Sequence, residues 1–242
     1  MTPGLHHRWY GDRWAQPPVV FLHGLGMDRR IWEPVVALLP RGVGAITLDL
    51  PGHGLAPVLP EQSGMPAVVA HVLAVLDHHE VGRAVLVALR EGGVVAGALA
   101  EAHPERVAGI VRVEVEAGLT HAHPELADRL DRVAREGLEA VAQEIVSGWP
   151  GAGPAHRAML LATPVAGYLQ LAHIVRAAAS GGGAEPVGAA GARELRMADE
   201  ARATGRWDRG LPRRARGPAG GHGRASPRAR RPPRGPCPVG HE

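Results

Sequence analysis

Short apolar runs alternate with segments of helical periodicity along the first half of the chain. The runs at 18–24, 43–54, 84–89 and 106–117 have the apolar character of buried parallel strands, and the second passes into a Pro-Gly turn. Between them, apolar residues at helical spacing predict helices over 29–40, 65–80 and 91–105. This alternation predicts an α/β fold with a doubly wound, mostly parallel sheet. In such sheets functional side chains gather at the carboxyl ends of the strands, where His23, Asp49 and Arg90 fall.

After a core of residues 1–118, residues 119–180 have helical periodicity with no intervening strand. One stripe of apolar positions comprises Leu126, Leu130, Val133, Leu138, Val141 and Ile145. A second helical stretch covers about 155–179. We interpret this segment as a helical cap inserted over the active end of the sheet.

Residues 181–242 form a tail of different composition. Gly, Ala, Arg and Pro supply 45 of its 62 residues, and only four are Val or Leu. Such a segment buries too little apolar surface to offset its ordering entropy, so we expect no strands and no ordered structure there. The same composition is typical of GC-rich DNA read out of frame, which gives a second interpretation. Either way, the C-terminal strands of the sheet are expected to be missing.

The charge of the chain is divided between these parts. The formal net charge is +3, but the tail holds 13 Arg against 6 acids while residues 1–180 hold 14 Arg against 18 acids. The high isoelectric point therefore belongs to the tail, and nucleic-acid binding is expected at most there. The single Cys237 excludes an internal disulfide and a multi-cysteine zinc site. No apolar run approaches the length of a membrane span and no targeting segment is recognisable, so we expect a cytoplasmic protein.

Three motifs together point to a known family. HGLG at 23–26, DLPGHG at 49–54 and the strand–turn–helix at 84–103 occur in an order and spacing that resemble the α/β-hydrolase family, over residues 8–180. The stretch ALREGGVVAGALAEAHPERV and the cap stretch GLEAVAQEIVSGW are similar to those of 3-oxoadipate enol-lactonases. The resemblance implies hydrolysis of an enol-lactone or ester in the β-ketoadipate pathway of aromatic catabolism, with no cofactor.

In that family a serine nucleophile occupies a tight turn between strand and helix, called the elbow. By the resemblance, the elbow here comprises Ala88, Leu89, Gly92 and Gly93 around position 90. Arg90 stands where the serine is expected. A guanidinium is protonated near neutral pH and has no lone pair with which to attack a carbonyl. Acyl-enzyme chemistry through this position is therefore excluded.

The resemblance also assigns an oxyanion hole, formed by the backbone N–H groups of Leu25 and Glu91. Two alternatives stay open for the side chains, since Glu91 could pair with Arg90 or Arg90 could reach into the pocket. Trp149 of the cap is a candidate pocket wall, with simple packing as the alternative.

The other two members of a catalytic triad have only weak candidates. His222 has the glycine neighbours of the family histidine but no preceding apolar strand, and Glu114 and Glu116 end a predicted strand where a salt link with Arg112 is the simpler interpretation. His23 is expected to be structural. His78 and His79 end a helix, where imidazole suits the carbonyl dipole, and no metal site is predicted.

Three hypotheses follow. The chain is a degenerate and inactive hydrolase, or a non-catalytic protein that binds a small carboxylate-bearing lactone, ester or related ligand through Arg90, or a protein whose Arg-rich tail binds nucleic acid. No membrane partner is expected, and the sequence does not indicate an oligomeric state.

Overall fold

The computed structural model describes residues 6–14, 17–113, 124–149, 152–180 and 194–196. All of them lie in the first of the chain's two compact units, which spans residues 1–206. The candidates Glu114, Glu116 and His222 lie outside the described residues, as does nearly all of the tail.

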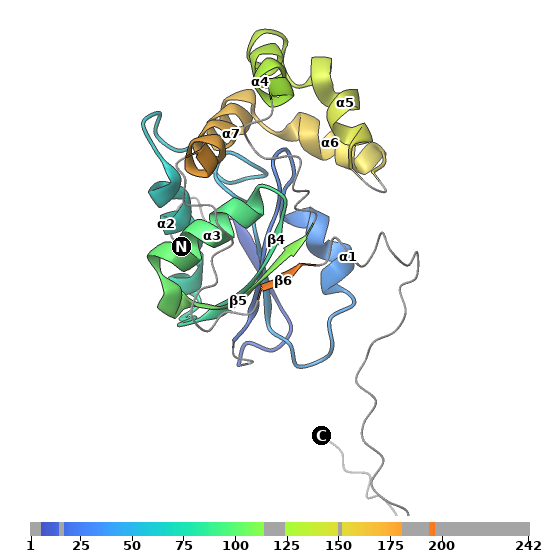
Figure 1. Cartoon of the computed structure of the whole chain (residues 1–242). Coiled ribbons are helices and arrows are strands. Elements are labelled where there is room, and N and C mark those ends of the chain that lie inside the picture. Colours follow the sequence, from blue (N-terminus) through green and yellow to red (C-terminus); the bar gives the residue numbers. More distant parts are fainter. Residues whose placement is uncertain (1–5, 15–16, 114–123, 150–151, 181–193, 197–242) are drawn as a thin grey trace, which may run out of the picture. The chain divides into compact units, whose positions relative to one another are not determined.

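The core is a six-stranded sheet in the order β1-β3-β2-β4-β5-β6 (Figure 1). The strands are β1 (His7–Tyr10), β2 (Val19–Leu22), β3 (Ala45–Leu48), β4 (Ala84–Leu89), β5 (Val107–Val113) and β6 (Glu194–Arg196). β1 pairs antiparallel with β3, and every other pairing is parallel. The predicted doubly wound, mostly parallel sheet is confirmed.

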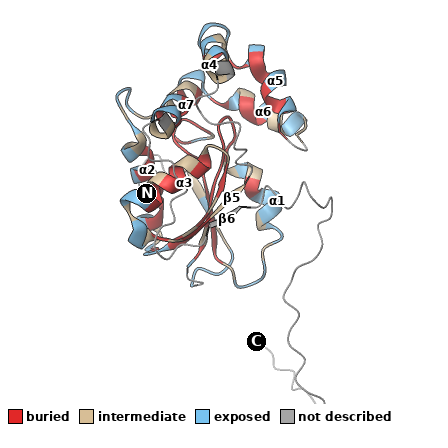
Figure 2. Cartoon of the chain, in the orientation of Figure 1, coloured by how far each residue is buried: buried red, intermediate tan, exposed pale blue. Residues whose placement is uncertain are grey.

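The core helices are α1 (Glu33–Val36), α2 (Met65–His78) and α3 (Gly92–Ala102), with 3₁₀ turns η1 (Arg29–Trp32) and η2 (Pro104–Arg106). α2 and α3 lie together on one face of the sheet and α1 lies on the other (Figure 1). Valines and a leucine at helical spacing bury one side of α2, namely Val68, Val69, Val72, Val75 and Leu76. The red stripe of buried residues along these helices faces the sheet (Figure 2).

The described residues of the predicted cap form helices and short connections, with no strand among them. The helices are α4 (Pro124–Glu136), the 3₁₀ turn η3 (Glu139–Val141), α5 (Ala142–Ser147), α6 (Pro154–Ala162) and α7 (Val165–Ser180). Figure 1 shows them over the end of the sheet that carries the carboxyl termini of its parallel strands. Among the described residues no single helix is long and apolar enough to cross a membrane, whereas α6 and α7 together pass that test with a 90° bend between them.

The structure differs from the sequence prediction, or adds detail to it, at four places. β1 is not among the predicted strands, because its alternation is weak and it gains strand partners only by lying beside β3. The helix expected at 29–40 is a 3₁₀ turn, then the four-residue α1 with Pro34 near its start, and then turns that end at Leu39. The second helical stretch of the cap is helical, and it consists of two helices separated at Pro164. Three tail residues form β6, because the open edge of β5 offers backbone partners that do not depend on side-chain composition.

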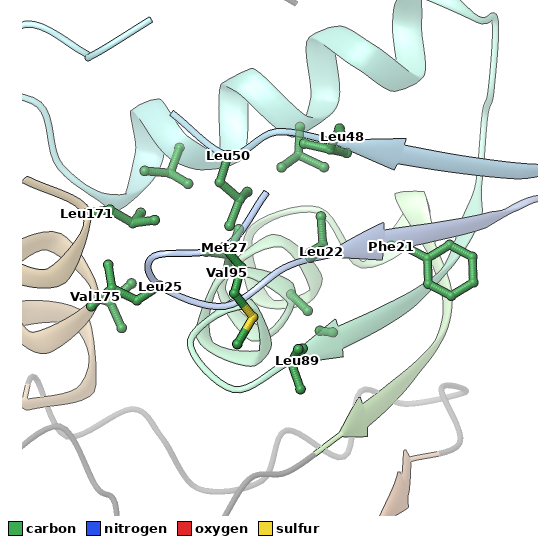
Figure 3. Close-up of a cluster of buried hydrophobic side chains, with 14 of the residues drawn as sticks. Phe21, Leu22, Leu25, Met27, Leu48, Leu50, Leu89, Val95, Leu171 and Val175 are labelled. Atoms are coloured by element: carbon green, nitrogen blue, oxygen red, sulfur yellow. The ribbon is translucent and has the colours of Figure 1, made fainter. Parts of the chain in front are cut away.

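The cap contacts the core through glycines. Gly52, in the turn after β3, has a φ of 74°, and a Cβ added there would lie 2.5 Å from Cα of Gly167 in α7. A Cβ on Gly26 would lie 2.5 Å from Leu160 of α6. Figure 3 shows Leu25 of the same loop facing Leu171 and Val175 of α7. Close backbone approach therefore sets how deeply the cap sits on the sheet.

This approach generates a stability prediction. Gly167→Ala should lower the free energy of unfolding by about 1–3 kcal/mol, because the new methyl group would overlap the carbonyl of Gly52 and must push α7 away. Gly82→Ala is the matched control, since Gly82 is exposed and its added Cβ has no atom within 4 Å. Urea denaturation of both variants measures the difference. Equal stability of Gly167→Ala and the parent chain would contradict the packing argument.

Candidate functional site

The elbow has the geometry expected of a nucleophile position. Arg90 follows β4 directly and has a φ of 49°, in the left-handed region that side chains other than glycine rarely adopt. Its N–H donates to the carbonyl of Val113 on β5, and its carbonyl accepts from Gly93 at the start of α3. Residue 90 is therefore held at the apex of a strained turn whatever its side chain.

Gly92 shows why small residues flank this apex. A Cβ at Gly92 would lie 2.7 Å from the carbonyl oxygen of His23 and 2.8 Å from that of Leu22. Both distances are shorter than real side chains allow, so α3 begins tightly against the end of β2. The elbow and the loop after β2 are in direct contact.

That loop carries the expected oxyanion donor, and the donor already has a partner. The N–H of Leu25 donates to Oε2 of Glu91 at 3.0 Å. The same carboxylate oxygen lies 3.9 Å from Nε of Arg90. The Glu91 side chain thus occupies the N–H group that the family resemblance assigns to an oxyanion hole, a contact that the sequence pattern does not predict.

Arg90 both pairs with Glu91 and reaches the pocket, so the two alternatives for its side chain hold together. A cavity of about 150 Å³ lies between the elbow and the cap, with Leu25, Arg90 and Glu91 on the core side. The cap side includes Arg129, Glu144, Ile145, Trp149 and Tyr168.

The cap wall contains a second ion pair. Nε of Arg129 donates to Glu144 at 2.8 Å, and this hydrogen bond holds the pKa of Glu144 below its usual value. Trp149 lines the cavity and is also buried in the cap core, so both interpretations of this residue apply. Burial, with the nearby carboxylate of Glu91, raises the pKa of Tyr168. The charged residues that line the cavity thus form two ion pairs, Arg90 with Glu91 and Arg129 with Glu144.

Two buried histidines hold the loops after β2 and β3 together. Nε2 of His23 accepts from the N–H of Leu50 at 2.8 Å, and Nε2 of His53 accepts from the N–H of Gly26 at 3.0 Å. Because each Nε2 is an acceptor, each Nδ1 carries the proton, which His23 donates to the carbonyl of Gly24 and His53 to that of Pro51. We call these reciprocal bonds the histidine clasp. His23 is structural, as expected.

Asp49, at the carboxyl end of β3, is also committed to backbone groups. Its carboxylate accepts from the N–H of Arg29 at 2.8 Å and from the N–H of Leu55 at 3.1 Å. A Cβ on Gly54 would lie 2.4 Å from this carboxylate, so the turn closes tightly around it. Of the three residues that end strands, only Arg90 faces the cavity.

Comparison with known proteins now decides the family. A family model described as the alpha/beta hydrolase fold matches residues 17–232, which is most of the chain and extends into the tail. This protein belongs to the α/β-hydrolase family.

Curated relatives of this chain include esterases. An esterase of Mycobacterium tuberculosis is 34% identical over 120 residues, which are 49% of this chain and 39% of that protein. A pimeloyl-[acyl-carrier protein] methyl ester esterase of Aeromonas hydrophila is 34% identical over 106 residues, covering 42% of this chain and 39% of that enzyme. The matched part of this chain thus spans about two fifths of the length of these relatives.

Solved structures agree on the fold. The enol-lactonase of Burkholderia xenovorans aligns with a TM-score of 0.63 and 24% identity, over 72% of this chain and 70% of that one. A thermophilic esterase of Thermogutta terrifontis, solved with malate bound, aligns with a TM-score of 0.60 and 28% identity, over 73% and 69% of the two chains. At 24% identity, the similarity to the enol-lactonase concerns the fold alone.

The histidine clasp generates a pH prediction. Burial lowers the pKa of His23 to about 4 and that of His53 to about 3, from an ordinary value of 6.5. As the pH falls from 6.5 toward 4, the unfolded chain binds protons at these two histidines that the folded chain does not bind. The free energy of unfolding should therefore fall by about 1.4 kcal/mol per pH unit for each histidine.

Urea denaturation between pH 7 and 4.5 measures this slope, because the range runs from above the ordinary pKa of 6.5 to just above the pKa of His23 in the folded chain. His53→Gln, whose amide oxygen can reach the position of Nε2 and accept from Gly26, should lose the part of the slope that His53 contributes, about 1.4 kcal/mol per pH unit. His103→Gln, at a partly exposed position, is the control and should keep the slope of the parent chain. An unchanged slope in His53→Gln would show that burial does not lower the pKa of His53.

Proposed function

We propose that this chain is a catalytically inactive member of the α/β-hydrolase family, related to hydrolases of small esters or lactones of the 3-oxoadipate enol-lactonase type. The observation that carries the proposal is Arg90 at the strained apex of the elbow. The family uses this apex to expose a nucleophile. A guanidinium cannot form an acyl-enzyme, so the position is retained while its chemistry is lost.

Glu91 supports the same conclusion independently. Stabilisation of a tetrahedral intermediate needs free N–H donors aimed at the developing oxyanion. Here the Leu25 N–H is bonded to a carboxylate, and an incoming carbonyl oxygen would have to displace a charged acceptor. Two separate features therefore oppose hydrolysis, the residue at position 90 and the one after it.

Substrate class and location are parts of this proposal. The likeness of the elbow and cap stretches to enol-lactonases, together with esterase relatives, supports a small ester or lactone as the ligand class of the ancestral site. Aromatic catabolism and a cytoplasmic location are expectations that rest on the sequence resemblance.

The proposal predicts no turnover. The parent chain should hydrolyse neither 4-nitrophenyl acetate nor 3-oxoadipate enol-lactone above the rate in buffer. Arg90→Ser should also be inactive, because Glu91 still covers the Leu25 N–H and both histidines of the clasp already use their two nitrogens on backbone groups. Initial rates measured by absorbance provide the test.

Arg90→Ala is the matched control, since it removes the guanidinium without adding a hydroxyl. Turnover by the parent chain that a serine-directed phosphonate abolishes would refute the proposal. Turnover by Arg90→Ser but not by Arg90→Ala would show that an undescribed part of the chain supplies a working base.

A second candidate function is binding of a small carboxylate. One observation favours it, namely that Arg90 lines the cavity and that its ion pair with Glu91, the one it makes within the described residues, is as long as 3.9 Å. A ligand carboxylate could take the place of the Glu91 carboxylate beside both Arg90 and the Leu25 N–H, with the Glu91 side chain turned away from these two donors.

This candidate predicts heat from 3-oxoadipate in isothermal titration calorimetry with the parent chain. Glu91→Ala should tighten binding by at least about tenfold, because it removes the competing carboxylate. The double variant Arg90→Ala/Glu91→Ala should lose that gain. Absence of heat at millimolar ligand with folded parent protein would rule the candidate out.

A further inference from the structure

Three histidines meet where the edge strand β1 lies against the C-terminal end of α2. His7 belongs to β1, His78 ends α2 and His79 follows it as the helix cap. Each offers a ring nitrogen, and the three nitrogens lie within 4.8 Å of one another. The rings of His7 and His79 meet edge to face, with centroids 4.7 Å apart.

This separation is close to what a metal ion requires. In a tetrahedral zinc site with Zn–N bonds of about 2.0–2.1 Å, two ligand nitrogens lie about 3.3 Å apart. Side-chain rotations that contract the cluster by about 1.5 Å or less would reach that geometry. Because His78 is exposed and lies at the end of a helix, its ring is able to make this adjustment.

One nitrogen of the cluster lacks a partner. Nε2 of His79 is buried and makes no hydrogen bond within the described part of the chain. A buried polar atom without a partner costs free energy, so such an atom in a native protein calls for an explanation. A metal ion bound among the three rings provides one.

The position of the cluster on its helix also suits a metal ion. The cluster lies at the C-terminal end of α2, where carbonyl groups favour a cation.

Arg13 is the nearby group that opposes a cation. Its side chain is exposed and its guanidinium lies over the ring of Trp9, 5.7 Å from the centroid. Solvent screens this repulsion. Asp77, in the last turn of α2, forms an ion pair with Arg106, with 2.7 Å between Oδ1 of Asp77 and a guanidinium nitrogen of Arg106, and is not part of the cluster.

We propose that His7, His78 and His79 form a binding site for a divalent transition-metal ion of the zinc class, which ties the edge strand β1 to the C-terminal end of α2. Imidazole nitrogen is a preferred ligand of zinc, copper and nickel, and a fourth position would be left for water. The site uses no residue of the elbow or cavity, so it is independent of the proposed loss of hydrolase activity.

Isothermal titration calorimetry of the full, metal-free and untagged chain with Zn²⁺ tests the proposal. The parent chain should bind one Zn²⁺ ion at this site more tightly than its other histidines bind Zn²⁺. Zn²⁺ should also raise the Tm of the chain, because only the folded state brings β1 and α2 together. His78→Ala should weaken this binding by at least about tenfold, since loss of a direct ligand costs no less than loss of a supporting contact.

His173→Ala is the matched control, because His173 is an exposed histidine on α7, distant in sequence from the cluster. It should bind Zn²⁺ as the parent chain does. His7→Ala is the second variant, and should weaken binding as His78→Ala does and abolish the rise in Tm. Absence of binding by the folded parent chain, or binding of equal strength by His78→Ala, would overturn the proposal.

Discussion

The histidine clasp determines the positions of the other groups at the carboxyl end of the sheet. His23 reaches from the loop after β2 to the backbone of the loop after β3, and His53 reaches back in the opposite direction. Each ring satisfies two backbone groups that would otherwise be buried without partners, at the cost of remaining uncharged. The clasp fixes the backbone of residues 24–26, and with it the Leu25 N–H that faces the elbow.

The shape of the elbow depends on its backbone, which explains how the turn can form without a nucleophile at its apex. Its shape depends on the positive φ at position 90 and on the absence of a side chain at Gly92, where β2 lies too close for a Cβ. Neither requirement specifies the side chain at the apex. An arginine at the apex leaves this backbone geometry in place, so membership of the α/β-hydrolase family does not by itself imply hydrolase activity.

Charge balance in the cavity follows from the same substitution. Arg90 places a positive charge at the base of the small cavity. Glu91 forms an ion pair with this charge and also accepts a hydrogen bond from the Leu25 N–H. Arg129 and Glu144 form a comparable pair on the cap side. The proposed metal cluster, by contrast, gathers three imidazole rings where the edge strand β1 lies against the C-terminal end of α2.

Sequence patterns determined the layers of this protein. Apolar runs of strand length between helices of regular period permit few arrangements other than a mostly parallel sheet, and the HGLG, DLPGHG and elbow motifs located the functional edge. The sequence also determined that residue 90 cannot act as a nucleophile, because that property belongs to the guanidinium and not to its surroundings.

Tertiary structure alone decided the rest. That Glu91 would bond to Leu25 depends on a contact across 66 residues, and that His7 would meet His78 and His79 depends on β1 pairing beside β3. β6 likewise exists because β5 offers an open edge, although its own residues predict no strand. Periodicity records which face of an element is buried, whereas these contacts depend on which element lies opposite, and that information arises only when the chain has folded.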